Sequence, residues 1–267
     1  MVEAHSESHE TDLALVDHGD GHPLLLVHGF PLDHSMWKHQ IADLSADYRI
    51  LAIDLPGFGK SPSLASPVTI VDYADAIAAL LDGLEIDQPI TFCGLSMGGY
   101  IGWQFLKHYP EKVHSLIACD TRTANDDERT ARGRRLMAQQ VVKDGSHSIA
   151  PGMATKICGE TTQERNPGVI QHVAEMIRAT DPHSIAAGQL AMSKREDTTP
   201  MLETIKIPTL FAVGMEDAIT PPDEMKSLAG MVSKSRYAEI AHAGHLAPLE
   251  NPVAFNAAVR SFLESTA

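Results

Sequence analysis

The chain has 267 residues, 43% of them hydrophobic, and its 35 acidic residues against 21 lysines and arginines give a formal net charge of −14. A chain of this length can bury a large core as one domain with an insertion. The negative charge excludes nucleic acid and an anionic membrane surface as partners, because both require a basic footprint.

We expect neither export nor membrane insertion. No apolar run approaches the roughly 20 residues needed to span a bilayer. The first residues are acidic and polar and no apolar stretch follows them, so we expect no signal peptide and a cytoplasmic protein. Cys93, Cys119 and Cys158 show no paired spacing and make an unconvincing disulfide set. The first two lie in strand-like runs, where we expect buried thiols.

Short apolar runs bounded by Gly and Pro alternate with helical patterns along the chain. Residues 13–16 are a candidate antiparallel edge strand. The apolar runs predict strands buried on both faces of a parallel sheet, at residues 24–27, 49–55, 90–93, 113–119, 209–213 and 236–240. The helical patterns cover residues 35–44, 70–84, 97–108, 222–231 and 252–263. This alternation implies an α/β fold, with a mostly parallel central sheet flanked by helices and right-handed crossovers.

One region, from about residue 122 to 194, breaks the alternation with four helical segments and no convincing strand. We predict that Asn125 caps the first helix, with Glu128 completing a capping pair. The second covers 150–157, and Asn166 and Asp181 each precede a Pro that opens one of the last two. Because such a block between two strands would cover their carboxyl ends, we divide the chain into a core part at 1–121, a helical lid at 122–198 and a second core part at 199–267.

Ser96 lies in the run Gly94-Leu95-Ser96-Met97-Gly98-Gly99, between a predicted strand and a predicted helix. This context is typical of a nucleophile elbow. The turn needs strained backbone angles, and a Cβ at either flanking position would crowd the strand or the helix, which accounts for Gly94 and Gly98. The geometry would expose the Ser96 hydroxyl at the carboxyl end of the sheet.

A serine nucleophile needs a base and an acid that orients the base. His245 follows the last predicted strand in a Gly-containing loop. Two carboxylates follow the preceding strand, and we assign Asp217 as the acid, since a helix is about to begin there, and expect Glu216 to point to solvent. Asp120 is an alternative acid, but we expect it to cap the entry to the lid. We expect His245 to take the Ser96 proton and Asp217 to stabilise the imidazole cation.

The oxyanion that forms in such chemistry needs backbone donors. We expect one from the N–H of Met97, directly after the nucleophile, and a second from the N–H of Phe30 in the loop after an early strand. His28 lies beside Gly29 in the same loop, and we expect it to hold the loop by hydrogen bonding rather than to act in catalysis.

Together, five motifs resemble the α/β-hydrolase superfamily, and the resemblance covers about residues 24–263. The motifs lie at residues 28–31, 54–61, 94–99, 214–217 and 243–245. The resemblance implies the α/β-hydrolase fold with a helical lid and assigns its catalytic roles to Ser96, Asp217 and His245, with Phe30 and Met97 as oxyanion donors. The 54–61 segment looks like the family's structural turn. In general appearance the chain is similar to small carboxylesterases and 3-oxoadipate enol-lactonase-like hydrolases.

Related enzymes with Asp at the elbow, haloalkane dehalogenases and epoxide hydrolases, are excluded because the elbow residue is Ser96. The resemblance therefore implies hydrolysis of small carboxylic esters through an acyl-enzyme, with no cofactor. Alternatives that share the triad are an enol-lactonase, a C–C bond hydrolase, a cofactor-free perhydrolase and a lyase of menaquinone synthesis. A non-catalytic, hormone-receptor-like binder is an alternative of a different class. We expect a small-molecule ester or lactone as partner, and a monomer or small homo-oligomer.

Substrate-pocket residues are harder to identify. Candidates are Trp37, near the mouth by motif position, and the lid residues Met137, Met153 and Met192, although lid methionines could instead fill the lid's own core. Five arginines open the lid, at positions 122, 129, 132, 134 and 135. One facing inward could hold a substrate carboxylate, but the acidic residues at 126–128 favour a salt-bridged outer face. The tail histidines His5, His9, His18 and His22 lack a ligand geometry, so we expect no metal.

Overall fold

The computed structural model describes residues 13–65 and 68–266. Within them lies a seven-stranded sheet in the order β1-β3-β2-β4-β5-β6-β7. The strands are β1 (Leu15–His18), β2 (Pro23–Val27), β3 (Arg49–Ile53), β4 (Ile90–Leu95), β5 (Val113–Cys119), β6 (Thr209–Gly214) and β7 (Ser235–Ile240). β1 pairs antiparallel with β3 and the other strands pair in parallel. The predicted sheet is thus confirmed, with the edge strand starting at Leu15 rather than Leu13.

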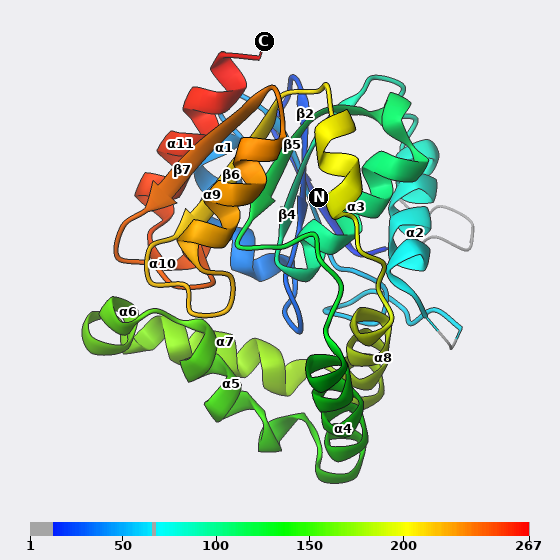
Figure 1. Cartoon of the computed structure of the whole chain (residues 1–267), viewed down its shortest axis with the longest axis vertical. Helices are drawn as coiled ribbons and strands as arrows, with labels where there is room; N and C mark the ends of the chain where they lie inside the picture. Colours follow the sequence, from blue (N-terminus) through cyan, green and yellow to red (C-terminus); the bar gives the residue numbers. More distant parts are fainter. Residues whose placement is uncertain (1–12, 66–67, 267) are drawn as a thin grey trace, which may run out of the picture.

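Helices cover both faces of the sheet (Figure 1). On one face lie α2 (Ile70–Gly83), α3 (Met97–His108) and α9 (Pro222–Met231), and on the other lie α1 (Lys38–Leu44), the short α10 (Ala247–Glu250) and α11 (Pro252–Glu264). β2, β4 and β6 are buried along their whole length, as expected for parallel strands covered on both faces. The predicted helix at 35–44 instead begins as a 3₁₀ turn at His34–Trp37, which is capped by the Asp33 carboxylate through the N–H of Ser35.

Between β5 and β6 the chain forms a layer of helices, which we call the helical insertion (residues 122–198; Figure 1, bottom). It contains α4 (Glu128–Asp144), α5 (Ala150–Ile157), α6 (Glu160–Arg165), α7 (Pro167–Ala179) and α8 (Pro182–Ser193). Sequence reasoning missed the six-residue, polar α6, which has no apolar period to mark it. It also chose the wrong cap for α4: the Asp127 carboxylate, not Asn125, accepts the N–H of Thr130. Asp181 caps α8 as predicted, whereas the Asn166 side chain makes no capping bond to α7.

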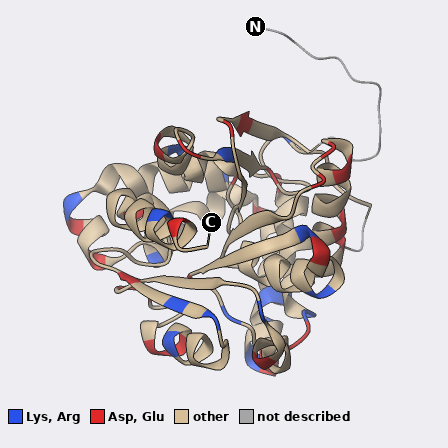
Figure 2. Cartoon of the chain, turned by 90° about the horizontal axis from the view of Figure 1, so that it is seen from above, with Lys and Arg blue, Asp and Glu red and all other residues tan. Residues whose placement is uncertain are grey.

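Charged side chains are interspersed over the elements (Figure 2). Among residues 13–65 and 68–266, no helix is both long enough and apolar enough to pass through a bilayer. The three cysteines are free thiols; Cys93 and Cys119 are buried, as expected, and Cys158 is buried as well. The sulfurs of Cys93 and Cys119 lie 3.8 Å apart on neighbouring strands.

Candidate active site

Ser96 occupies a strained turn between β4 and α3, with φ 54° and ψ −110°. Positive φ is uncommon for a residue with a side chain and raises the local energy of the backbone. The two flanking glycines are required by sterics: a Cβ on Gly94 would meet the carbonyl of Gly98, and a Cβ on Gly98 would meet the carbonyl of Val27. The Ser96 N–H donates to the carbonyl of Cys119 at 2.9 Å, so the turn is also tied to β5.

Three side chains from distant parts of the chain form one hydrogen-bonded line. His245 Nε2 lies 2.8 Å from Ser96 Oγ, and His245 Nδ1 lies 2.7 Å from an oxygen of Asp217. Their positions follow from the sheet, because Ser96, Asp217 and His245 follow β4, β6 and β7, whose carboxyl ends lie at one edge. An Asp217 carboxylate that accepts Nδ1–H leaves Nε2 to accept the Ser96 hydroxyl proton.

The Asp217 carboxylate is surrounded by donors. It accepts the N–H groups of Ile219 (2.7 Å) and Thr220 (3.1 Å), and the Thr220 hydroxyl donates to it as well. Burial raises the pKa of Asp217, but the His245 charge and these hydrogen bonds hold that pKa below its ordinary value. Asp217 is therefore ionised at neutral pH, although it is only 4% exposed.

Phe30 and Met97, predicted as oxyanion donors, flank the same site. Met97 is the first residue of α3, where N–H groups have no partner within the helix. Phe30 lies in the loop after β2, and β2 is hydrogen-bonded to β4. Neither N–H donates a hydrogen bond to another described residue. Their assignment to an oxyanion hole stays a prediction.

His28 holds the Phe30 loop in place, as expected. The ring is fully buried, its Nδ1 lies 2.9 Å from the carbonyl of Gly29, and its Nε2 accepts the N–H of Leu55 at 3.0 Å. An accepting Nε2 places the proton on Nδ1, so the ring is neutral. Burial keeps the pKa of His28 below its ordinary value, in agreement with that tautomer.

The helical insertion is bonded directly to the loops that carry Asp217 and His245. The His245 N–H donates to the carbonyl of Ile157 (3.1 Å). Glu250 accepts the N–H groups of Gly159 (2.7 Å) and Leu246 (3.0 Å), so one carboxylate joins the insertion to the residue after His245. The segment between α5 and α6 therefore belongs to the site.

Glu216, which we expected to point to solvent, makes a second link of this kind. Its carboxylate accepts the N–H (2.8 Å) and the hydroxyl (2.5 Å) of Thr161. The expectation was wrong because Thr161, 55 residues away in sequence, packs against this loop only in the folded chain.

The four pocket candidates occupy different surroundings. Trp37 is fully buried, with its ring 6.2 Å from that of Phe255, so the structure places it in the hydrophobic core. The sulfurs of Met137 and Met192 accept hydrogen bonds from Gln189 (3.0 Å) and Arg134 (3.4 Å), and both belong to the packing of α4 on α8. Met153 is half-buried and packs against buried hydrophobic side chains of the core. A pocket role stays a prediction, most simply for Met153.

Three of the five arginines that open the insertion bind carboxylates of the chain itself. Arg134 donates to Asp126 (2.5 Å) and Arg135 to Glu128 (2.7 Å), which favours the salt-bridged face. Arg122 instead binds Glu224 at 3.1 Å. Sequence reasoning missed Arg195, which is 3% exposed and binds Asp126 at 2.6 Å.

Arg195 also connects the insertion to the helix that follows the elbow. Its guanidinium carbon lies 4.3 Å from the centre of the Tyr100 ring, in the first turn of α3. A guanidinium over an aromatic face is attracted by the ring quadrupole. No local sequence signal marks Arg195, because its partners lie in other elements.

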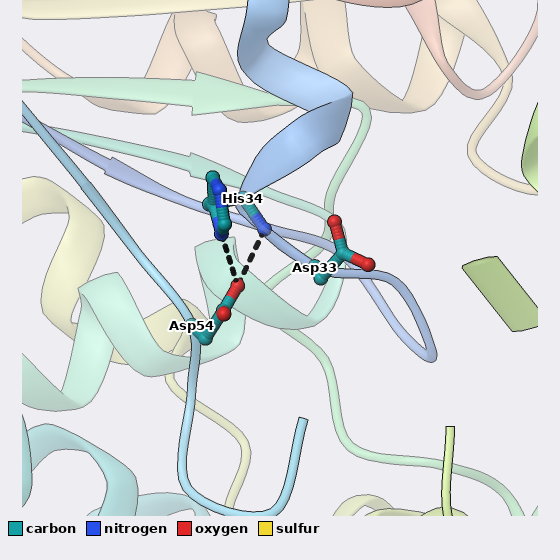
Figure 3. Close-up of side chains that lie close together, drawn as sticks. All are labelled: Asp33, His34 and Asp54. Atoms are coloured by element: carbon teal, nitrogen blue, oxygen red, sulfur yellow. Dashed lines mark hydrogen bonds and ion pairs between the residues drawn. The ribbon is translucent and has the colours of Figure 1, made fainter. Parts of the chain in front are cut away.

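Asp33, His34 and Asp54 form a cluster with the residue types of a metal site (Figure 3). The ring Nδ1 and the backbone N–H of His34 both lie 2.7 Å from one Asp54 oxygen, while the other oxygen accepts the N–H of Lys60 at 2.9 Å. Asp33 turns away from Asp54 in Figure 3. The chain's own donors occupy both Asp54 oxygens. Asp54 therefore joins His34 to the turn at 54–61, which we expected to be structural.

Of the tail histidines, His5 and His9 lie outside the described residues. His18 is exposed and His22 Nε2 lies 2.9 Å from the Thr91 hydroxyl. A second cluster of metal-ligand type among the described residues consists of Asp120, Asp217 and His245, whose polar atoms lie within 4.8 Å of one another.

Comparisons with known proteins identify the family and the fold. A model of the alpha/beta hydrolase fold matches residues 22–252. The chain is 30% identical to 3-oxoadipate enol-lactonase 2 of Acinetobacter baylyi, covering 86% of this chain and 84% of the relative. It is similar in structure to a thermophilic esterase of Thermogutta terrifontis, solved with malate bound, with a TM-score of 0.93 and 39% identity over 95% of this chain and 93% of that one. The enol-lactonase of Burkholderia xenovorans gives a TM-score of 0.87 and 27% identity, over 94% and 96%.

Proposed function

The chain belongs to the alpha/beta hydrolase fold family, and we propose that within this family it is a serine hydrolase of small carboxylic esters. The observation that carries the proposal is the line of hydrogen bonds from Asp217 through His245 to Ser96. A base within 2.8 Å of a serine hydroxyl, itself oriented by an ionised acid, is the arrangement that activates a serine for attack.

In the proposed reaction Ser96 Oγ attacks the ester carbonyl and its proton passes to His245 Nε2. Asp217 holds the Nδ1–H tautomer and stabilises the cation that forms. The N–H groups of Phe30 and Met97 stabilise the oxyanion of the tetrahedral intermediate. His245 then protonates the departing alcohol and leaves an acyl-enzyme. Water, deprotonated by His245, releases the acid and restores Ser96.

Ester hydrolysis is favoured over lactone hydrolysis by the comparisons and by the arginines. The highest of the identities given above, 39%, is to an esterase. A lactone derived from a dicarboxylate needs a cation for its second carboxylate. Three of the five arginines that open the insertion are paired with carboxylates of the chain, and the other two, Arg129 and Arg132, are exposed at the surface. An enol-lactonase stays the second candidate, because the same side chains can open a lactone and a relative with that name is 30% identical.

The test is the initial rate on p-nitrophenyl acetate, butyrate and octanoate, with Ser96→Ala as the blank. We expect many turnovers per enzyme, fastest on the short esters, and a loss of about 10⁶-fold in kcat in the variant. The Ser96→Ala protein should fold normally, since the hydroxyl is not part of the core. A single stoichiometric acylation of Ser96 would favour a non-catalytic binder. Turnover of enol lactones alone would favour the second candidate.

A further inference from the structure

Asp120 follows β5 directly and is fully buried, with φ 43°. Its N–H donates to the carbonyl of Ala212 (2.9 Å), and its Oδ1 accepts the N–H of Gly214 (2.8 Å). The side chain therefore continues the pairing of β5 with β6 one step past the strand ends. The next residue, Thr121, donates from its hydroxyl to the carbonyl of Ser96 at 2.7 Å. Two consecutive residues thus tie the Asp217 loop and the Ser96 turn to the same strand.

The carboxyl group of Asp120 lies beside the hydrogen-bonded line described above. A carboxylate oxygen of Asp120, one of Asp217 and a ring nitrogen of His245 lie within 4.8 Å of one another. Oδ2 of Asp120 has no hydrogen-bond partner among the described residues. The titratable groups facing Asp120 are Asp217 after β6, His245 after β7, Glu250 in α10 and its own neighbour Cys119.

Two adjacent buried carboxyl groups cannot both be charged without strong repulsion. The donors are divided unequally between them: Asp217 accepts from His245, Ile219 and Thr220, whereas Gly214 is the one donor to Asp120 in the described part of the chain. Burial, followed by the charge of Asp217, raises the pKa of Asp120 well above its ordinary value. The two environments therefore separate the pKa values of the two carboxyl groups. The proton of the pair resides on Asp120.

We propose that Asp120 is a positioning residue: a neutral carboxylic acid that directs its O–H toward the Asp217 carboxylate and so fixes the group that orients His245. Its effect on turnover rests on the proposed function, whereas its protonated state does not. The unpartnered Oδ2 is then the hydroxyl of the acid, a donor with a carboxylate in front of it, rather than a buried charge without a partner.

The first experiment measures protonation without reference to activity, by comparing urea unfolding of wild type and Asp120→Asn from about pH 5 to about pH 8. An acid that is protonated in the folded state and ionised in the unfolded state makes folding less favourable as pH rises. The ratio of the wild-type folding constant to that of the Asp120→Asn variant should therefore fall as pH rises, by up to about tenfold per pH unit where folded Asp120 keeps its proton. A ratio that stays constant would show that Asp120 is ionised and would overturn the proposal.

The second experiment measures positioning, through kcat and the pH profile of kcat/KM on the best p-nitrophenyl ester. Asparagine keeps the acceptor for Gly214 and a donor toward Asp217, so Asp120→Asn should lose less than about tenfold in kcat, with the profile midpoint unmoved. Asp120→Ala lacks both groups and should lose about 100-fold. Equal kcat values for the two variants would contradict positioning. A loss in Asp120→Asn as large as that of Asp217→Asn would make Asp120 the ionised acid and also overturn the proposal.

These two experiments separate the inference from the proposed function. If no ester is hydrolysed, the unfolding series still decides whether Asp120 is neutral. If Asp120→Ala does not fold, the kcat and pH profile of Asp120→Asn decide between positioning and an ionised acid.

Discussion

The sheet and the helical insertion hold their residues in place by different interactions. In the sheet, β2, β4 and β6 are buried from end to end, and the Ser96 turn is fixed by backbone contacts at Gly94 and Gly98. The insertion is joined to the sheet by charged groups at two places. At one, Arg195, which is paired with Asp126, lies over the Tyr100 ring of α3. At the other, Glu250 binds Gly159, between α5 and α6, and Glu216 binds Thr161 in α6.

This difference indicates which regions of the protein tolerate substitutions. Backbone contacts cannot be altered by exchanging one side chain for another of similar size, so the geometry around Ser96 is rigid. Charged contacts depend on both partners, and removing one leaves the other unpaired. Substitutions in the sheet should therefore affect the stability of the whole fold or the catalytic reaction. Substitutions in the insertion should affect how the insertion packs over the site.

The largest expected effect comes from Asp217→Asn, which keeps the side-chain volume but removes the charge that orients His245. We expect a fall of about 10⁴-fold in kcat on p-nitrophenyl butyrate, with unchanged circular dichroism. Near-wild-type activity would contradict the assignment of Asp217 as the acid.

A second prediction compares one glycine from each region. Gly98→Val places side-chain atoms against the carbonyls of Val27 and His28, so we expect at least about 3 kcal/mol of lost stability. The matched control is Gly133→Ala in the exposed part of α4, where a Cβ would meet nothing within 4 Å. That change should stabilise the protein by about 0.5–1 kcal/mol. Urea denaturation measures both, and a stable, active Gly98→Val protein would contradict the elbow geometry.

The third prediction concerns the buried ion pair between the two ends of the insertion, which also places Arg195 over the Tyr100 ring. Asp126→Ala leaves the guanidinium of Arg195 buried without a carboxylate, and we expect a loss of about 3 kcal/mol. The control is Glu128→Ala, which breaks the exposed pair with Arg135 and should cost less than about 1 kcal/mol. Limited proteolysis should cut the Asp126→Ala protein first within residues 122–198. Equal stability of the two variants would show that the buried pair does not hold the insertion.

The smallest expected effect is at the His34–Asp54 pair of the sheet region. The Asp54 hydrogen bond raises the pKa of His34, so its stabilisation is complete below about pH 6.5 and is lost as pH rises through the folded value. His34→Gln should therefore reduce stability more at about pH 6 than at about pH 9, by less than about 1 kcal/mol. Urea unfolding at the two pH values checks this, and a pH-independent difference would show that the His34 charge does not contribute.

Much of the site could be predicted because its signals are local. The elbow needs only the five residues Gly94 to Gly98, and the loops of Asp217 and His245 directly follow apolar strand runs. Since the carboxyl ends of parallel strands share one edge, placing each residue after its strand is enough to bring Ser96, Asp217 and His245 together. Their hydrogen bonds of 2.7 and 2.8 Å agree with that expectation.

The partners of individual polar side chains could not be predicted in this way. Asp126 binds Arg195 at a separation of 69 residues, Glu216 binds Thr161 at 55, and Asp120 accepts from Gly214 at 94. Each partner is supplied by another element, and its identity depends on how the insertion and the strands pack.

The sequence by itself determined the order of strands and helices, because hydrophobic period and turn residues act over a few positions. It also determined which residues end the strands that meet at the site. Only the tertiary structure decided that Trp37 packs against Phe255 in the core. It likewise decided that the segment between α5 and α6 touches the His245 loop, and that Asp120 faces Asp217. Those outcomes depend on contacts between distant segments, which form only once the chain is packed.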